Sequence, residues 1–128
     1  YCVAHGIPII ATCRGMQYIN VMFGGKLWYH PKLPVNRTRG VDHQVWLVKE
    51  QRNIWVNNYH SDCIYEEGLA SCFEPLAIDR ENHVVEAYGS DEMKILALQW
   101  HPERRFETAN AYEETRKIIL DFIQKYVK

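Results

Sequence analysis

An α/β fold is predicted for this chain of 128 residues, on three observations. Apolar runs typical of buried strands recur along the chain, at residues 7–12, 74–79, 84–88 and 95–100. The first run leads directly into a helical pattern at residues 14–23. Apolar residues at helical spacing form one stripe over residues 110–127, which predicts a helix that packs on the sheet.

The segments between these runs predict shorter elements. Residues 44–48 and 54–56 are predicted to be strands, and residues 28–40 a polar loop with two prolines. A helical turn is expected around residues 62–68, and residues 79–82 are expected to link two strands as a hairpin.

Two helix ends carry cap signals. Residues 1–5 predict the tail of a helix with Gly6 as its C-cap, and Asn110 with Glu113 predicts a variant of the capping box.

Composition and charge exclude several classes of protein. The net charge is −1 and the pI about 6.6, which predicts no nucleic-acid partner. No apolar stretch approaches the roughly 20 residues of a membrane helix, so no membrane partner is expected. The four cysteines follow no disulfide or zinc-ligand spacing, so unpaired thiols in a reducing cytoplasm, and no metal, are expected.

A strand that ends in Cys13 is the most informative feature. The apolar residues 7–12 precede it, and Gly15 follows as a helical pattern begins. A strand, a tight turn that carries the nucleophile and a helix make up a nucleophile elbow. The helix N-terminus favours negative charge and predicts a thiol pKa below its ordinary value of about 8.5. Taken alone, Cys13 can equally be read as a small buried hydrophobe.

The second feature is His101, at the end of the last strand-like run. Pro102 biases His101 towards extended backbone, where residues two apart share a face. Glu103 can therefore reach the ring of His101 and fix its tautomer. Together, Cys13, His101 and Glu103 predict a triad of nucleophile, base and orienting group.

Two segments carry a resemblance to a known family. Residues 13–17 (CRGMQ) and 99–103 (QWHPE) resemble the two signatures of class I glutamine amidotransferases. Between them, residues 42–45 (DHQV), 56–60 (VNNYH) and 85–87 (VEA) resemble, in the same order, segments of the γ-glutamyl hydrolase branch, peptidase family C26. This branch includes γ-glutamyl-γ-aminobutyrate hydrolase.

The resemblance implies both a fold and an activity. The implied fold is the three-layer, flavodoxin-like fold of class I glutamine amidotransferases with its N-terminal strands missing, so residues 1–128 are expected to be the C-terminal part of a single domain. The implied activity is hydrolysis of the γ-glutamyl amide bond of glutamine or of a γ-glutamyl amine, through a thioester on Cys13. The expected partner is this small-molecule substrate, and no cofactor is expected.

Further site residues follow from the resemblance. The backbone N–H of Arg14 is expected to donate to the oxyanion, and Gln17, His60 and Ser61 are expected to bind the glutamyl group. The family's other oxyanion donor lies in a loop before residue 1, so this chain alone is expected to be a poor catalyst. Left open are whether His60 is an exposed loop histidine, and whether the side chain of Arg14 pairs with substrate or with Glu86.

This sequence departs from the family pattern at two positions. Ala11 replaces a glycine two residues before the nucleophile, and its methyl group crowds the elbow without having to block it. Asn58 replaces a serine, which alters the expected substrate contacts.

Two other functions stay open. A biosynthetic glutaminase has the same triad but delivers ammonia to a synthetase partner. A non-catalytic binding protein with a degenerate pocket is the other, although the complete set of Cys13, His101 and Glu103 argues against it. A homodimer or a complex with a synthetase is compatible with the sequence.

Overall fold

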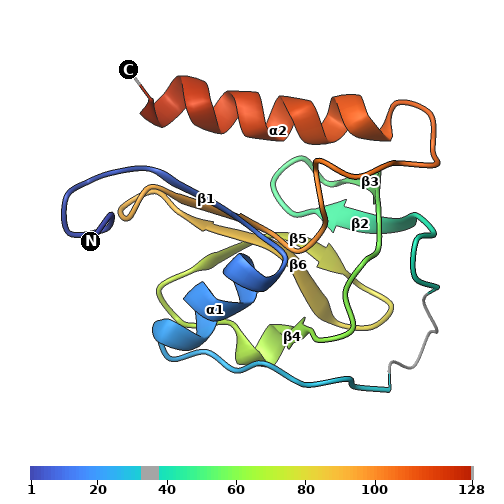
Figure 1. Ribbon diagram of the computed structural model, residues 1–128, viewed down its shortest axis with the longest axis horizontal. Coiled ribbons are helices and arrows are strands. Elements are labelled where there is room, and N and C mark those ends of the chain that lie inside the picture. The colour runs from blue at the N-terminus through green and yellow to red at the C-terminus, as the bar shows by residue number, and fades with distance from the viewer. Residues whose placement is uncertain (33–37, 128) are drawn as a thin grey trace.

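The computed structural model of the protein describes residues 1–32 and 38–127, and it has the predicted α/β architecture (Figure 1). Part of the polar loop predicted over residues 28–40 lies outside the described residues. The elements are β1 (Ile9–Thr12), α1 (Arg14–Met22), β2 (His43–Leu47), β3 (Arg52–Val56), β4 (Ile64–Tyr65), a 3-10 turn (Glu66–Gly68), β5 (Glu74–Asp79), β6 (Val84–Ser90), β7 (Ile95–Leu98) and α2 (Ala111–Tyr126).

The strands form one mixed sheet. Its order is β1-β7-β6-β5-β2-β3, and the short β4 pairs with β6 outside this path. Strands β1 and β7 are parallel, and the other pairs are antiparallel. The turn predicted at residues 79–82 does join β5 and β6 as a hairpin. Strand β4 was not predicted, since two residues give no periodic signal.

The two helices cover opposite faces of the sheet, which makes three layers (Figure 1). On one face, Phe122 and Ile118 of α2 pack on a cluster that includes Val45 and Trp100. On the other face, Met16 of α1 joins a second cluster. Both faces of the central strands are therefore buried, which explains their continuous apolar runs.

Two predicted caps differ from the observed ones. Residues 2–6 form a hydrogen-bonded turn rather than a helix tail, although Gly6 has the expected positive φ of 67°. Asn110 precedes α2 with a φ of 68°, and its side chain makes no capping hydrogen bond. A capping side chain needs extended backbone at this position, so the predicted capping box is wrong.

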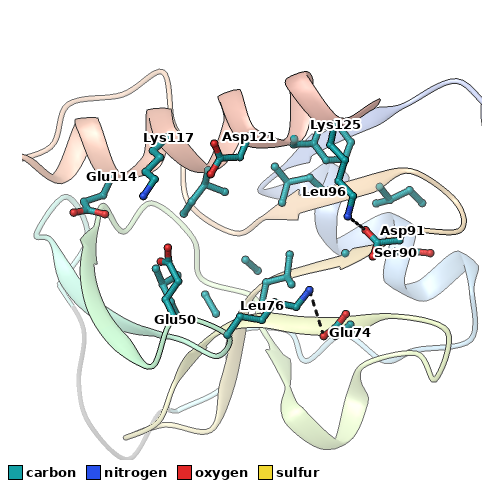
Figure 2. A pocket seen from close by; sticks show the side chains of 18 of the residues that line it. Glu50, Glu74, Leu76, Ser90, Asp91, Leu96, Glu114, Lys117, Asp121 and Lys125 are labelled. Carbon is teal, nitrogen blue, oxygen red and sulfur yellow. Dashed lines mark hydrogen bonds and ion pairs between the residues drawn. The ribbon is translucent and has the colours of Figure 1, made fainter. Parts of the chain in front are cut away.

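A groove of about 260 Å³ runs between α2 and the sheet (Figure 2). Apolar side chains such as Leu76 and Leu96 form its floor, while ion pairs such as Lys125–Asp91, with 3.0 Å between Nζ and Oδ1, line its rim. Its Ser90 and Asp91 lie where β6 ends and β7 is about to begin. Cys13 comes directly after the last residue of β1, at the opposite end of the strands from Ser90 and Asp91. The groove is therefore separate from the predicted triad.

Candidate active site

Cys13 occupies the sharp turn between β1 and α1. Its φ of 49° and ψ of −109° are unusual for a residue with a side chain. The backbone N–H of Cys13 donates to the carbonyl of Leu98 at 2.8 Å, which extends the β1–β7 ladder up to the turn. The strand, strained turn and helix predicted for a nucleophile elbow are therefore present.

Ala11 is compatible with this elbow. Its side chain is buried in the cluster beneath α1. A Cβ placed on Gly15 would lie 3.7 Å from the Cβ of Ala11, which is ordinary van der Waals contact. The methyl group in place of the family's glycine is thus accommodated by the packing of the first turn of α1.

One cavity of about 440 Å³ brings together most of the predicted site residues. Its walls come from the elbow, from the segments around Tyr59 and His101, and from the positions of His30 and Arg39. The lining residues are Thr12, Cys13, Arg14, Gln17, His30, Arg39, Tyr59, His60, Ser61, Asp62, His101 and Arg104. Glu103 does not line the cavity and contacts His101 instead.

His101 and Glu103 make the contact that their spacing predicts. The Nδ1 atom of His101 lies 2.9 Å from Oε1 and 3.2 Å from Oε2 of Glu103. With Nδ1 donating to the carboxylate, Nε2 is the nitrogen left to accept a proton. This is the arrangement required of a base and its orienting group.

The electrostatic environment of Cys13 differs from the expectation. Burial raises the pKa of the Cys13 thiol above its ordinary value, because it disfavours the thiolate. A hydrogen bond from the backbone N–H of Arg14, and the charges of Arg104 and Arg14, oppose this effect without cancelling it. Cys13 is therefore a thiol at rest, and a base must remove its proton before it can attack.

A buried amide pair connects α1 to the end of β7. Gln17 donates from Nε2 to Oε1 of Gln99 at 3.1 Å and to the carbonyl of Asp62 at 3.0 Å. Gln99 donates from its own Nε2 towards Sγ of Cys13 at 3.8 Å. Gln99 belongs to the second signature, but no role for its side chain follows from the sequence. Its position one residue beyond β7, at the end where Cys13 follows β1, is the signal that could have identified it.

Three arginines border the cavity, and only Arg14 was expected there from the sequence. Arg104 lies over the ring of Tyr59 with 4.9 Å between its Cζ and the ring centroid, and Arg39 lies at 5.9 Å from the same centroid. Arg14 is exposed, and its guanidinium donates to the hydroxyl of Tyr18 rather than to Glu86. The cavity is consequently rich in positive charge.

His60 and Ser61 both line the cavity, as expected of residues that bind substrate. Nδ1 of His60 lies 2.7 Å from the carbonyl of Asp62, and Nε2 lies 3.8 Å from Oε2 of Glu86. His60 is thus a buried histidine rather than an exposed loop histidine. Asn58 donates to the carbonyl of Thr38 at 3.2 Å, so it holds a neighbouring loop.

Comparison with known proteins identifies the class. The structure is similar to the crystal structure of a glutamine amidotransferase from Thermotoga maritima, with a TM-score of 0.65 and 18% sequence identity. The match covers 98% of this chain and 53% of the Thermotoga protein. The glutamine amidotransferase-like protein YvdE of Lactococcus lactis is 31% identical over 79% of this chain and 48% of its own length. The fold and these relatives define the chain as a member of the class I glutamine amidotransferase superfamily.

Within this superfamily, residues 1–103 match the Peptidase C26 family, and the chain belongs to that family. Component 2 of the aminodeoxychorismate/anthranilate synthase of Bacillus subtilis is also similar, at 27% identity over 95% of this chain and 61% of that protein. The chain spans about half to three fifths of the length of these relatives. Among the described residues, no helix is long and apolar enough to cross a membrane.

Proposed function

We propose that the full-length protein cleaves the γ-glutamyl amide bond of glutamine or of a γ-glutamyl amine, with Cys13 as the nucleophile. The observation that carries this proposal is the placement of Cys13 on a strained elbow that shares a cavity with His101, while Glu103 holds Nδ1 of the same ring. Membership of the Peptidase C26 family supports hydrolysis of an amide bond.

The proposed reaction needs His101 to move two protons. In the first step, Nε2 of His101 takes the thiol proton of Cys13 as Sγ attacks the amide carbon. The backbone N–H of Arg14 donates to the oxyanion, and collapse of the tetrahedral intermediate expels the amine, which receives the proton from His101. In the second step, His101 activates a water that hydrolyses the thioester and releases glutamate.

We propose that residues 1–128 form the C-terminal part of a single domain. The second donor to the oxyanion is proposed to come from a part of that domain outside these residues. Loss of one such donor costs roughly 10²–10³ in rate in a well-studied protease. This chain alone is therefore expected to be a weak catalyst.

Substrate contacts are proposed on the same cavity wall. Gln17 uses its amide nitrogen within the protein, so its Oε1 is the atom offered to the α-amino group of the substrate. Ser61 and the edge of the His60 ring are proposed to border the glutamyl group. The guanidinium groups of Arg39 and Arg104 suit its carboxylate.

A glutaminase that supplies ammonia to a synthetase is the second candidate function. Several relatives carry names of this kind, such as the glutamine-hydrolysing GMP synthase of Aquifex aeolicus, 31% identical over 77% of this chain and 19% of its own length. In this case the partner is a synthetase protein or domain, and glutamine is the substrate. Both candidates use the same residues and place the reaction in the cytoplasm.

The deciding experiment compares the full-length protein with its Cys13→Ala variant on glutamine, γ-glutamyl-γ-aminobutyrate and other γ-glutamyl amides, with released glutamate and amine as readouts. Release of a bulky amine that depends on Cys13 supports the free-standing hydrolase. Turnover of glutamine alone, or only with a partner present, supports the ammonia donor. Turnover that survives Cys13→Ala excludes the proposed mechanism.

A further inference from the structure

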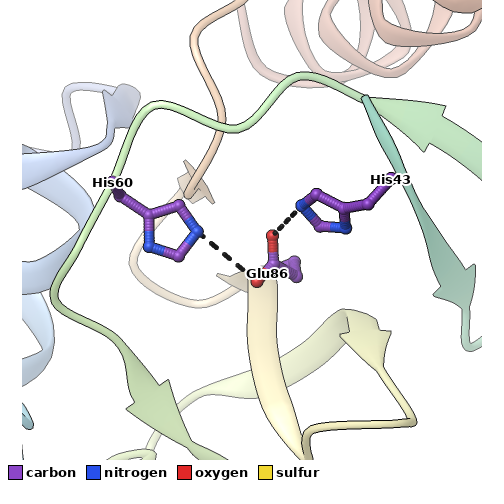
Figure 3. Close-up of side chains that lie close together, drawn as sticks. All are labelled: His43, His60 and Glu86. Carbon is purple, nitrogen blue, oxygen red and sulfur yellow. Dashed lines mark ion pairs between the residues drawn. The ribbon is translucent and has the colours of Figure 1, made fainter. Parts of the chain in front are cut away.

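His43, His60 and Glu86 form a cluster of largely buried side chains beside the cavity that contains Cys13 (Figure 3). Nε2 of His43 lies 3.5 Å from Oε1 of Glu86, and Nε2 of His60 lies 3.8 Å from Oε2 of the same carboxylate. One nitrogen from each ring and a carboxylate oxygen all lie within 4.8 Å of one another.

The sheet topology explains why residues distant in sequence meet here. Glu86 is near the start of β6, where its carbonyl accepts from the N–H of Gln99 at 2.7 Å, just beyond the end of β7. His43 begins β2 and pairs with Val56, the last residue of β3, and His60 follows four residues later. All three therefore lie at the same end of the strands as Cys13.

Both imidazole rings have the orientation expected of metal ligands. Nδ1 of His60 faces the carbonyl of Asp62 at 2.7 Å, and Nδ1 of His43 faces the carbonyl of Gln44 at 3.4 Å. A ligating histidine usually donates its second N–H to a backbone carbonyl or carboxylate, which fixes the other nitrogen as the ligand. In both rings that other nitrogen is Nε2, the atom that faces Glu86.

The distances and donor types suit one small cation. Two imidazoles and a carboxylate are a common protein ligand set for zinc and related ions. A tetrahedral zinc site with bonds of about 2.1 Å sets its ligand atoms about 3.4 Å apart. The separations of 3.5 and 3.8 Å are close to this value, although each goes to a different oxygen of Glu86. Because one ligand atom from each residue lies within 4.8 Å of the others, the side chains have to draw closer together when an ion binds.

The burial of these side chains favours the binding of a cation. The side chain of Glu86 has no exposed surface, and those of His60 and His43 are 4% and 15% exposed. A carboxylate in such a place needs a compensating positive charge. A divalent ion bound between the two rings and the carboxylate would supply this charge.

We propose that His43, His60 and Glu86 bind a divalent transition-metal ion, with Zn²⁺ as the representative and a water as its fourth ligand. The ion would join β2, β6 and the segment after β3. Because that segment also supplies Tyr59, His60 and Ser61 to the cavity, the ion would act as a clamp on one wall of the proposed glutamyl site. The sequence could not reveal this ligand set, since the three residues follow no short spacing.

The test uses the full-length protein in a Cys13→Ala background, because a reactive thiol also binds zinc. After treatment with a chelator and dialysis, Zn²⁺ is titrated by calorimetry, and Co²⁺ is added to record the visible absorption of a low-symmetry site. One ion per chain and a raised Tm with Zn²⁺ are expected. Binding weakened at least tenfold by His43→Gln or His60→Gln supports the proposal.

Two further variants serve as controls, one for zinc binding at other histidines and one for the role of the carboxylate. His83→Gln changes an exposed histidine that contacts Glu66, and it should leave the binding unchanged. Glu86→Gln tests the carboxylate, and circular dichroism checks that it folds; if it does not, the two histidine variants decide. No binding of Zn²⁺ or Co²⁺ in the Cys13→Ala protein, or equal loss with His83→Gln, would overturn the proposal and leave an imidazole–carboxylate network only. Neither readout depends on γ-glutamyl hydrolysis.

Discussion

The side-chain amide of Asn57 holds the backbone of His101 from both sides. Oδ1 of Asn57 accepts from the N–H of His101 at 3.0 Å, and Nδ2 donates to the carbonyl of His101 at 2.8 Å. Asn57 is fully buried and follows β3 directly, so the position of His101 depends on a strand at the far end of the sheet order. The amide therefore fixes the backbone position of His101, whose side chain lines the cavity.

Asn57→Ala is expected to lower both stability and activity. The change leaves the partly buried N–H and carbonyl of His101 without these bonds, and a buried group that loses its bond costs about 1–3 kcal/mol. We expect a free energy of unfolding lower by about 2–4 kcal/mol, and a fall in kcat that exceeds the change in KM because the base is displaced. Denaturant unfolding and steady-state kinetics measure the two effects.

Asn53→Ala is the control for Asn57, since Asn53 is an exposed asparagine of β3, the strand that Asn57 follows. It should change the free energy of unfolding by less than about 0.5 kcal/mol and leave kcat unchanged. If Asn57→Ala retains full kcat in folded protein, the amide does not position His101.

Glu103→Gln tests the orienting carboxylate. The amide can still contact the ring but no longer stabilises the imidazolium that the proposed mechanism forms on His101. The side chain of Glu103 is 60% exposed, so solvent weakens its charge, and we expect a fall in kcat of about 10–100-fold, smaller than in buried triads. Glu107→Gln, another exposed carboxylate of this loop, should retain kcat.

The pH dependence of alkylation tests the environment of Cys13. Because burial raises the pKa of this thiol, the iodoacetamide rate of folded protein should reach half its maximum at a higher pH than in urea. A raised folded pKa also means that the neutral thiol's contribution to stability is present at low pH and is lost as pH rises through that pKa. The measurement uses a Cys2→Ser, Cys72→Ser background. A midpoint at or below the value in urea would contradict the assignment.

The apolar runs of β6 and β7 were predictable as strands because these two strands are buried on both faces. Predicted strands at residues 44–48 and 74–79 correspond to His43–Leu47 and Glu74–Asp79. The elbow at Cys13 and the contact of His101 with Glu103 were predictable because both depend on neighbours within a few residues.

Features that depend on distant segments were not predictable. The pKa of Cys13 was expected to be low from the helix behind it, but the burial that raises it comes from the folded surroundings. Arg104 and Arg39 reach the cavity through their contacts with Tyr59, and the bonds of Asn57 span 44 residues of sequence. No short spacing reports such contacts, since the sheet order creates them.

An ion pair fastens the first turn of α2 to the sheet and predicts a pH-dependent stability. Nη2 of Arg52, in β3, lies 2.7 Å from Oε2 of Glu114, and this hydrogen bond lowers the pKa of the Glu114 carboxyl. A lowered folded pKa gives stability that is present above the ordinary carboxyl pKa of about 4.3 and is lost as pH falls through the folded value.

Both partners are about a third or more exposed, so screening limits the expected effect to about 0.5–1 kcal/mol at neutral pH. Glu114→Gln should lower the free energy of unfolding by that amount at pH 7 and by less at pH 3, because the native carboxylate takes up its proton as the pH falls. Glu113→Gln, the exposed neighbour on the same turn, serves as the control. Denaturant unfolding at the two pH values measures the difference, and an equal loss at both would show that the charge of Glu114 is not what holds α2.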